Sequence, residues 1–189
     1  MVLIPAKNLT LEEFLKLPET KPASEYINGQ IIQKPMPQGK HSILQVELVT
    51  AINAVVKPQR IAIAFSELRC SFGGRSVVPD VTVFAWERIP VDESGDIANV
   101  FPTYPDWTIE ILSPDQSQTK VTGNILHCLK HGSRLGWLLD PDVRSVLVYP
   151  PGKQPELFTE GGDVLPVPDL VKLHLTVGDV FGWLKLGGS

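Results

Sequence analysis

The chain has 189 residues, of which 43% are hydrophobic and 20% are charged, a balance typical of a folded globular protein. The net charge of −4 argues against a broad basic surface, so any binding to nucleic acid would need a local basic rim or a bridging metal. No apolar run is long enough to span a membrane, and the start, Met1 to Pro5, is too short and uncharged for a secretory signal, so we expect a cytoplasmic protein without membrane contact.

The N-terminal segment carries two local signals. Thr10 and Glu13 form the pattern of a capping box, which predicts a short helix that ends near Pro18. Residues 26–33 are typical of two short strands around an Asn28-Gly29 turn.

The next segment predicts a long helix followed by strands. Apolar residues recur every three or four positions from His41 to about Val56, which indicates a helix with one buried face. Residues 61–65 then predict a strand, which residues 68–72 could continue past a bend. Residues 77–84 predict a strong strand.

A loop at 90–105 separates these strands from a second group of elements. Two strands, at 107–112 and 135–140, flank a helix at 118–131 that Gly132 closes, and this order favours a parallel βαβ unit. Residues 144–149 predict an antiparallel partner strand. A turn at Gly161-Gly162 and a short helix near 177–184 follow. The whole order predicts an α/β domain with a mixed sheet flanked by helices.

Two acidic residues lie in apolar strand sequence. Asp80 follows Pro79 within the 77–84 segment, and Glu110 lies between Ile109 and Ile111. Burying a carboxylate costs several kcal/mol unless it is paired, and coordination of a divalent cation would compensate both charges at once. A strand with one solvated face, or pairing with arginine, is the alternative. Glu67 is a third candidate, either close to the site or on an exposed edge.

The helix at 118–131 has a polar stripe of Lys120, Asn124, His127 and His131. A stripe that faces water is the favoured interpretation for the two histidines, although their spacing would also allow a metal site. Lys120, at the start of the helix, could reach the end of the strand that bears Glu110.

His41 begins the first long helix, and Gln45 lies one turn further on. The helix dipole disfavours a charged histidine at this end. His41 could therefore act as a base or contact a substrate, or it could simply cap the helix.

The two cysteines, Cys70 and Cys128, lie in unrelated contexts without a CxxC pair. This pattern favours neither zinc binding nor a redox pair, so we expect reduced, packed thiols.

Three segments together resemble a known family: 78–81 around Asp80, 105–114 around Glu110, and 136–141 (Gly-Trp-Leu-Leu-Asp-Pro). They are similar to the Uma-two family, a bacterial domain of unknown function in the PD-(D/E)XK restriction-endonuclease-like superfamily. The N-terminal Glu25-Tyr-Ile-Asn-Gly29 and His41 resemble the family's pattern too. The resemblance runs from about residue 9 to residue 149.

The resemblance implies a restriction-endonuclease-like fold, with a mixed central sheet of roughly four or five strands, flanking helices, an N-terminal hairpin and extra C-terminal strands. It implies one domain over residues 1–189, with a core at about 40–150. Asp80 and Glu110 would match the family's acidic ligands and hold Mg²⁺ or Mn²⁺. Since members of this superfamily often pair to cut both DNA strands, a homodimer acting on DNA is expected.

The chain departs from the family pattern where a lysine should stand. Leu112 occupies the position of the motif lysine, and Asn124 occupies the helix position that replaces it in this family. Lys120 is then the expected catalytic cation, with His41, Gln45, Glu67 and Asn124 as accessory residues. Two hypotheses follow: a Mg²⁺-dependent DNA endonuclease, or a binding or scaffold protein that keeps the nuclease fold without catalysis.

Overall fold

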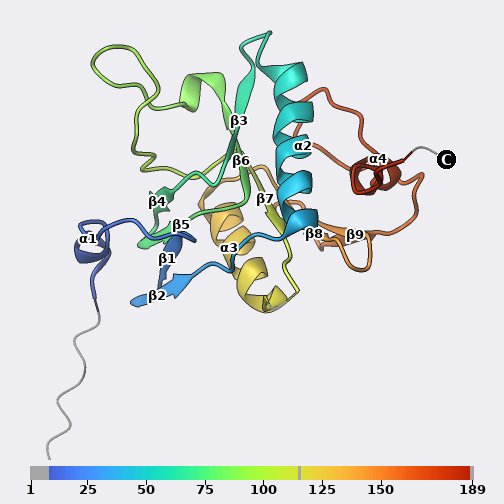
Figure 1. Cartoon of the computed structure of the whole chain (residues 1–189). Coiled ribbons are helices and arrows are strands. Elements are labelled where there is room, and N and C mark those ends of the chain that lie inside the picture. Colours follow the sequence, from blue (N-terminus) through green and yellow to red (C-terminus); the bar gives the residue numbers. More distant parts are fainter. Residues whose placement is uncertain (1–8, 115, 188–189) are drawn as a thin grey trace, which may run out of the picture.

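The computed structural model describes residues 9–114 and 116–187 (Figure 1). The N-terminal half contains α1 (Leu11–Phe14), β1 (Ser24–Ile27), β2 (Gln30–Gln33), α2 (Gly39–Val56), β3 (Ala62–Ser66), β4 (Cys70–Phe72), β5 (Arg75–Val77) and β6 (Val81–Ala85). The C-terminal half contains the 3-10 helix η1 (Trp86–Arg88), β7 (Trp107–Ile111), α3 (Gln118–His131), β8 (Leu135–Asp140), β9 (Ser145–Tyr149), β10 (Glu156–Phe158) and α4 (Val177–Gly182).

A six-stranded mixed sheet forms the centre of the molecule, in the order β10-β9-β8-β7-β6-β3. Strands β7 and β8 run parallel and are joined by α3, whereas the other neighbours are antiparallel. The predicted mixed sheet and its βαβ unit are therefore confirmed. Strand β10 and helix α4 belong to the extra C-terminal elements that the sequence predicted.

A smaller antiparallel sheet, in the order β2-β1-β5-β4, lies beside the central one. The predicted hairpin is its outer part. Asn28 and Gly29 have positive φ angles of 52° and 83°, the backbone geometry that a tight two-residue hairpin turn requires. Tyr26 pairs with Ser76, so strand β1 attaches the hairpin to β5. The capping box of α1 is also confirmed, because Thr10 and Glu13 bond each other's backbone N–H groups.

Helices α2 and α3 pack on different sets of sheet residues (Figure 1). Leu44, Leu48 and Ile52 of α2 share one core with Ile109 and Ile111 of β7. The α3 side chains Val121 and Ile125 pack in another cluster with Leu138 and Tyr149. Because side chains alternate along a strand, the even-numbered residues of β7 face α3.

The strand predicted at 77–84 is divided in the structure. Val77 is the last residue of β5 in the small sheet, whereas residues 81–84 belong to β6 in the central sheet. Pro79 lies in the connection, where its lack of an N–H group prevents continued ladder pairing. Asp80 therefore occupies a corner between two sheets, and the expectation that it lies within one strand was wrong.

The interpretation that the two histidines of α3, His127 and His131, face water was also wrong for His127. Asn124 and His127 are only 6% and 7% exposed. The small sheet covers this face, with Phe72 stacked on His127 at a centroid distance of 4.7 Å. His127 Nε2 also lies 3.1 Å from the carbonyl oxygen of Phe72.

Both cysteines are buried and free, as predicted. Within residues 9–114 and 116–187, no helix has the length and apolar character needed to cross a membrane.

Candidate active site

Asp80 and Glu110 face each other across the junction of β6 and β7. Val81 pairs with Ile109 in the antiparallel register, so Asp80, one residue earlier, lies opposite Glu110, one residue later. Both residues are 2% exposed. The side-chain alternation that sends Ile109 and Ile111 towards α2 sends the carboxyl group of Glu110 to the opposite side of β7.

The ammonium group of Lys34 lies between the two carboxylates. Its Nζ is 2.6 Å from Oδ1 of Asp80 and 3.8 Å from Oε2 of Glu110. It also donates to the carbonyl oxygen of Val78 at 2.7 Å. Lys34 directly follows β2, so the pairing of the hairpin with β5 brings this lysine to the junction of the sheets.

Three further hydrogen bonds fix the position of Asp80. The backbone N–H of Ile111 donates to Oδ2 at 2.7 Å. The Gln45 side chain donates to the Asp80 carbonyl oxygen at 2.8 Å, and the N–H of Glu67 donates to the same oxygen at 3.1 Å. Gln45, buried on α2, thus holds the backbone of the corner.

His41 reaches the same carboxylate from the first turn of α2. Its Nε2 is 3.2 Å from Oδ2 of Asp80, and the residue is 7% exposed. His41 does not cap the helix, because the N-cap position belongs to Gln38, and its imidazole contacts Asp80 instead.

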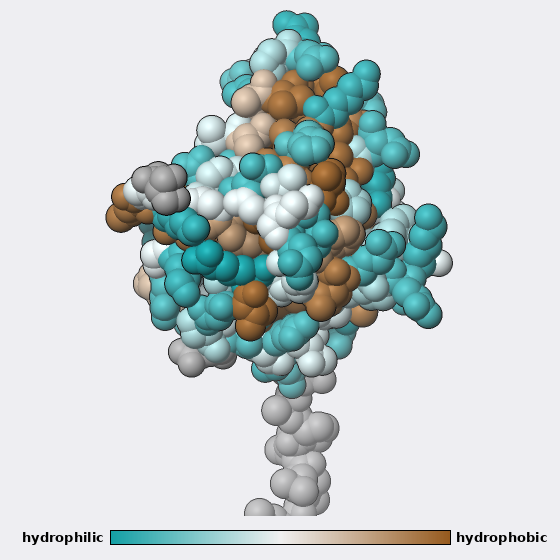
Figure 2. Space-filling model, turned by 90° about the vertical axis from the view of Figure 1, so that its right-hand side faces the viewer, coloured by the Kyte–Doolittle hydropathy of each residue, from teal (hydrophilic) through white to brown (hydrophobic). Residues whose placement is uncertain are grey.

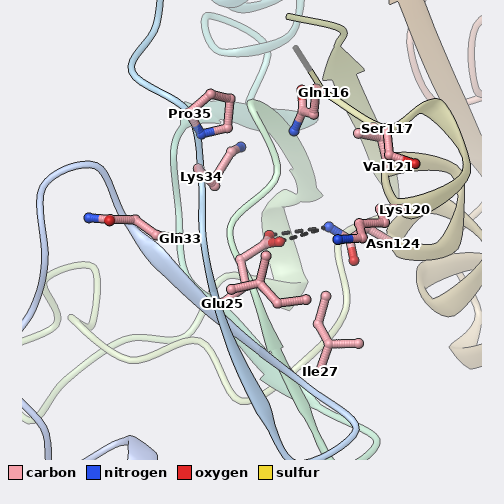
Figure 3. A pocket seen from close by; sticks show the side chains of 11 residues that line it. Glu25, Ile27, Gln33, Lys34, Pro35, Gln116, Ser117, Lys120, Val121 and Asn124 are labelled. Carbon is pink, nitrogen blue, oxygen red and sulfur yellow. Dashed lines mark hydrogen bonds between the residues drawn. The ribbon is translucent and has the colours of Figure 1, made fainter.

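Glu25 on β1 is a third buried carboxylate near this site, with 5% exposure. It accepts from the N–H of Val78 at 2.8 Å. The amide nitrogen of Asn124 donates to both of its oxygens, at 3.2 and 3.1 Å (Figure 3). This contact joins α3 to the hairpin.

The charged groups shift one another's pKa values. Burial disfavours the charged form of Lys34, but the carboxylates of Asp80, Glu110 and Glu25 outweigh it and raise its pKa. Burial would raise the pKa of Asp80, but Lys34 and His41 hold it well below its usual value. Burial raises the pKa of Glu110 far above its usual value; Lys34 opposes this shift, while Asp80 and Glu25 reinforce it. One ammonium group thus serves several buried carboxyl groups, and the protonated form of Glu110 is favoured in the absence of a further cation.

The residues present fit a divalent cation that binds oxygen ligands. Oε1 of Glu110 is buried without a hydrogen-bond partner among the described residues, as are Nδ1 of His41 and Oδ1 of Asn124. A buried polar atom without a partner is costly and marks a place where an ion or a ligand can compensate. Within the described ranges, no cluster of three or more His, Cys, Asp or Glu side chains is arranged to hold a metal. Mg²⁺ is usually held by one or two carboxylates, water and substrate phosphate, so two carboxylates suffice.

A cavity of about 310 Å³ opens beside Lys34, between the hairpin and the start of α3 (Figure 3). Both Glu25 and Asn124 line it, together with Lys34. Lys120 lines it too, but this lysine is exposed. The cavity leads from solvent to the ammonium group that contacts the acidic pair.

The structure brings together most of the residues that the sequence singled out. Asp80, Glu110, His41 and Gln45 converge, and Asn124 joins them through Glu25. Glu67 has an exposed side chain and contributes only its backbone N–H.

Sequence reasoning missed the role of Lys34, and it noticed Glu25 only as part of a family-like segment. A lysine in a loop rich in proline gives no pattern that separates it from a solvated residue. Glu25 could have been found as an acidic residue at a buried position of the predicted hairpin, next to Tyr26.

Comparison with known proteins supports the architecture. Residues 11–178 match the model of the Uma2 (Uma-two) family, described as "Putative restriction endonuclease". A crystal structure described as a putative nuclease belonging to DUF820, from Anabaena variabilis ATCC 29413, is 66% identical in sequence, with a TM-score of 0.92. The similarity covers 93% of this chain and 99% of the Anabaena chain.

A second solved structure, the DrdV–DNA complex, shares 13% identity over 77% of this chain and 13% of its own, with a TM-score of 0.29. That score is too low to carry an argument. No curated protein matches the chain.

Proposed function

Since the chain belongs to the Uma2 family of restriction-endonuclease-like proteins, we propose that it is a Mg²⁺-dependent endonuclease that hydrolyses phosphodiester bonds in DNA. The description of the family and that of the Anabaena structure both support nuclease activity. The metal and the substrate are inferred from the chemistry of the site.

One observation carries the proposal: Asp80 and Glu110 converge on a buried point where two carboxyl groups share a single ammonium group. Oxygens of both carboxylates lie within 4 Å of the same nitrogen, and Glu110 keeps one oxygen without a partner among the described residues. A pair of carboxylates that only stabilised the fold would be expected to have its charges balanced. This pair would instead hold Mg²⁺ or Mn²⁺.

A divalent ion bound there would lower the pKa of a water molecule and stabilise charge on the phosphodiester. The chain's own groups prepare this arrangement. Ile111 and Gln45 keep Asp80 in place through its Oδ2 and its carbonyl oxygen. His41 contacts the same carboxylate from α2, so side chains of α2 and the backbone of β7 together fix the position of Asp80.

The acidic net charge does not oppose DNA binding at this cavity. Lys34 and Lys120 both line it, together with the polar side chains of Gln33, Gln116 and Ser117. A phosphodiester entering the cavity would therefore meet a locally cationic and polar wall, despite the net charge of −4.

Cleavage of supercoiled plasmid DNA tests this function, with Mg²⁺, Mn²⁺ or EDTA and with a matched RNA substrate. We expect Asp80→Asn and Glu110→Gln to lower the metal-dependent rate at least about a hundredfold, since each removes a ligand charge. Asp169→Asn is the matched control, because Asp169 is exposed on the C-terminal segment. Cutting that survives both ligand substitutions would contradict the proposal.

A second readout separates binding from catalysis. Mg²⁺ at about a hundred times its Kd should stabilise the wild-type protein by about 2.7 kcal/mol, and neither ligand variant should respond. Metal binding without cleavage of DNA or RNA would reject the nuclease and favour a binding or scaffold role.

We also propose a homodimer. Figure 2 shows the face that bears α4, where hydrophobic areas are broken up by hydrophilic side chains, so this face lacks the continuous apolar surface of an obligate dimer. Any dimer would have to use another face. Light scattering coupled to gel filtration measures the mass directly, and a monomer at micromolar concentration would contradict the proposal.

A further inference from the structure

Lys34 combines three features that a lysine of purely structural role does not need. Its side chain is only 10% exposed, although burying an ammonium group is costly. It contacts Asp80 and Glu110, the two proposed metal ligands. It also lines the cavity of about 310 Å³ between the hairpin and the start of α3.

The donors of its ammonium group are not all used. An ammonium group has three N–H donors. Among the described residues, Asp80 Oδ1 and the Val78 carbonyl oxygen accept two of them, at 2.6 and 2.7 Å. Glu110 at 3.8 Å is beyond hydrogen-bond distance. One donor therefore remains for a group that enters the cavity.

The hydrogen bonds to Asp80 and Val78 also fix the position of the ammonium group. Lys34 is held further by its backbone, which donates to the carbonyl oxygen of Ala23 at 2.9 Å. A charge held in place before the substrate arrives stabilises developing charge better than a mobile one, because it does not reorganise during the reaction.

Lys120 does not share these features. It lines the same cavity, but its side chain is exposed and has no described contact with Asp80 or Glu110. A flexible, solvated lysine attracts a polyanion but does not fix a reacting group.

We propose that Lys34 is a catalytic residue of the proposed nuclease, which donates a hydrogen bond from Nζ to a non-bridging oxygen of the attacked phosphodiester and offsets the negative charge that develops there. Lys120 then contributes only to substrate affinity. The inference rests on the proposed function and assigns to the hairpin a part of the chemistry that the sequence had placed on α3.

The test measures kcat and KM for cleavage of a labelled DNA duplex by wild type, Lys34→Met and Lys120→Met. For Lys34→Met we expect kcat to fall about a hundredfold or more, since one preorganised donor is lost. For Lys120→Met we expect a higher KM and a kcat within about threefold of wild type. Lys57→Met, on an exposed residue after the end of α2, controls for the loss of one positive charge.

Binding of Mn²⁺ alone, followed by electron paramagnetic resonance, provides a readout that does not depend on cleavage. Removing Lys34 takes a positive charge from the ligands, so Lys34→Met should bind Mn²⁺ at least as tightly as wild type. Tight Mn²⁺ binding together with lost cleavage is the expected signature.

Restoring the ammonium group tests the inference even if Lys34→Met folds poorly. Lys34→Cys, alkylated with 2-bromoethylamine, carries an ammonium group at nearly the same distance from the backbone. Cys70 and Cys128 are 0% exposed and should be spared in the folded protein. We expect alkylation to raise kcat at least about tenfold over unmodified Lys34→Cys.

Three results would overturn the role of Lys34. Cleavage by Lys34→Met within about threefold of wild type would reduce Lys34 to a counter-ion, and faster cleavage would make it an obstacle to the metal. Complete alkylation of Lys34→Cys without recovery would exclude the ammonium group as the active feature. Failure of the proposed function looks different: wild type would cleave neither DNA nor RNA, which removes both proposals together.

Discussion

The Nζ of Lys34 lies 2.6 Å from Oδ1 of Asp80, and the two side chains are only 10% and 2% exposed. This ion pair joins the N-terminal hairpin to the corner between β5 and β6. Because both groups are out of water, each depends on the other for compensation of its charge.

Breaking this pair from one side should destabilise the metal-free protein strongly. We expect Lys34→Met and Asp80→Asn each to cost about 3 kcal/mol, since each leaves a buried group without its partner. The double variant should cost less than the sum by at least about 1 kcal/mol. Urea unfolding in EDTA measures all four proteins.

The exposed pair Lys40–Asp142, with side chains 60% and 58% exposed, is the control for this cycle. Its coupling should stay below about 1 kcal/mol because water screens it. Equal coupling energies for the two pairs would show that burial adds nothing to the Lys34–Asp80 contact.

Glu110→Gln should make the metal-free protein more stable than wild type at high pH. Burial, first of all, and then the neighbouring carboxylates raise the pKa of Glu110. A raised acid pKa in the fold contributes stability below the pKa of the unfolded chain, and this contribution is lost as pH rises through the folded pKa. The advantage of Glu110→Gln in melting temperature should therefore be larger at pH 8 than at pH 5. An advantage that shrinks as pH rises would contradict the prediction.

His127 should make the protein sensitive to mild acid. Burial lowers its pKa from 6.5 to about 4, so the folded protein keeps it neutral while the unfolded chain takes up a proton. Its contribution to stability is complete above pH 6.5 and falls as pH drops towards 4, by at most about 3 kcal/mol.

Replacing His127 with Phe should remove that loss while keeping the ring that stacks on Phe72. The difference in unfolding free energy between wild type and His127→Phe, measured from pH 7.5 to pH 4, gives the slope directly. His174→Asn, at an exposed position, should leave the slope unchanged. A constant difference across this range would mean that His127 does not titrate in the way proposed.

Gly136 on β8 should be intolerant of any side chain. A Cβ atom there would lie 2.3 Å from Cγ2 of Ile125, which is buried on α3. We expect Gly136→Ala to cost about 1–3 kcal/mol by overpacking. Since leucine lacks the Cγ2 atom, adding Ile125→Leu should recover part of the loss. Chemical unfolding of the single and double variants measures this, and a double variant no better than Gly136→Ala would place the clash elsewhere.

Much of the fold follows from local sequence patterns. The helix at 118–131 and the strand at 135–140 have the bounds that the periodicity and Gly132 indicated. The hairpin turn at Asn28-Gly29 was also predictable, because Asn and Gly adopt the left-handed conformation more readily than other residues. Such patterns depend on residues close in sequence, so they can be recognised without knowledge of the tertiary structure.

The candidate site was predictable in part. An acidic residue in an apolar strand is conspicuous, and this drew attention to Asp80 and Glu110. The burial of Asn124 and His127 was not predictable, because a polar stripe on a helix has the same sequence pattern whether water or a second sheet covers it. Only the small sheet, with Phe72 against His127, decides between them.

The sequence by itself determined which elements form and which acidic residues need compensation, since both depend on local periodicity and on the cost of burying charge. The tertiary structure alone decided that Lys34, 46 positions before Asp80, supplies the positive charge between the carboxylates. The physical reason is the pairing of β1 with β5, a long-range contact that places the hairpin beside the junction of the two sheets. No local pattern around Lys34 encodes that pairing.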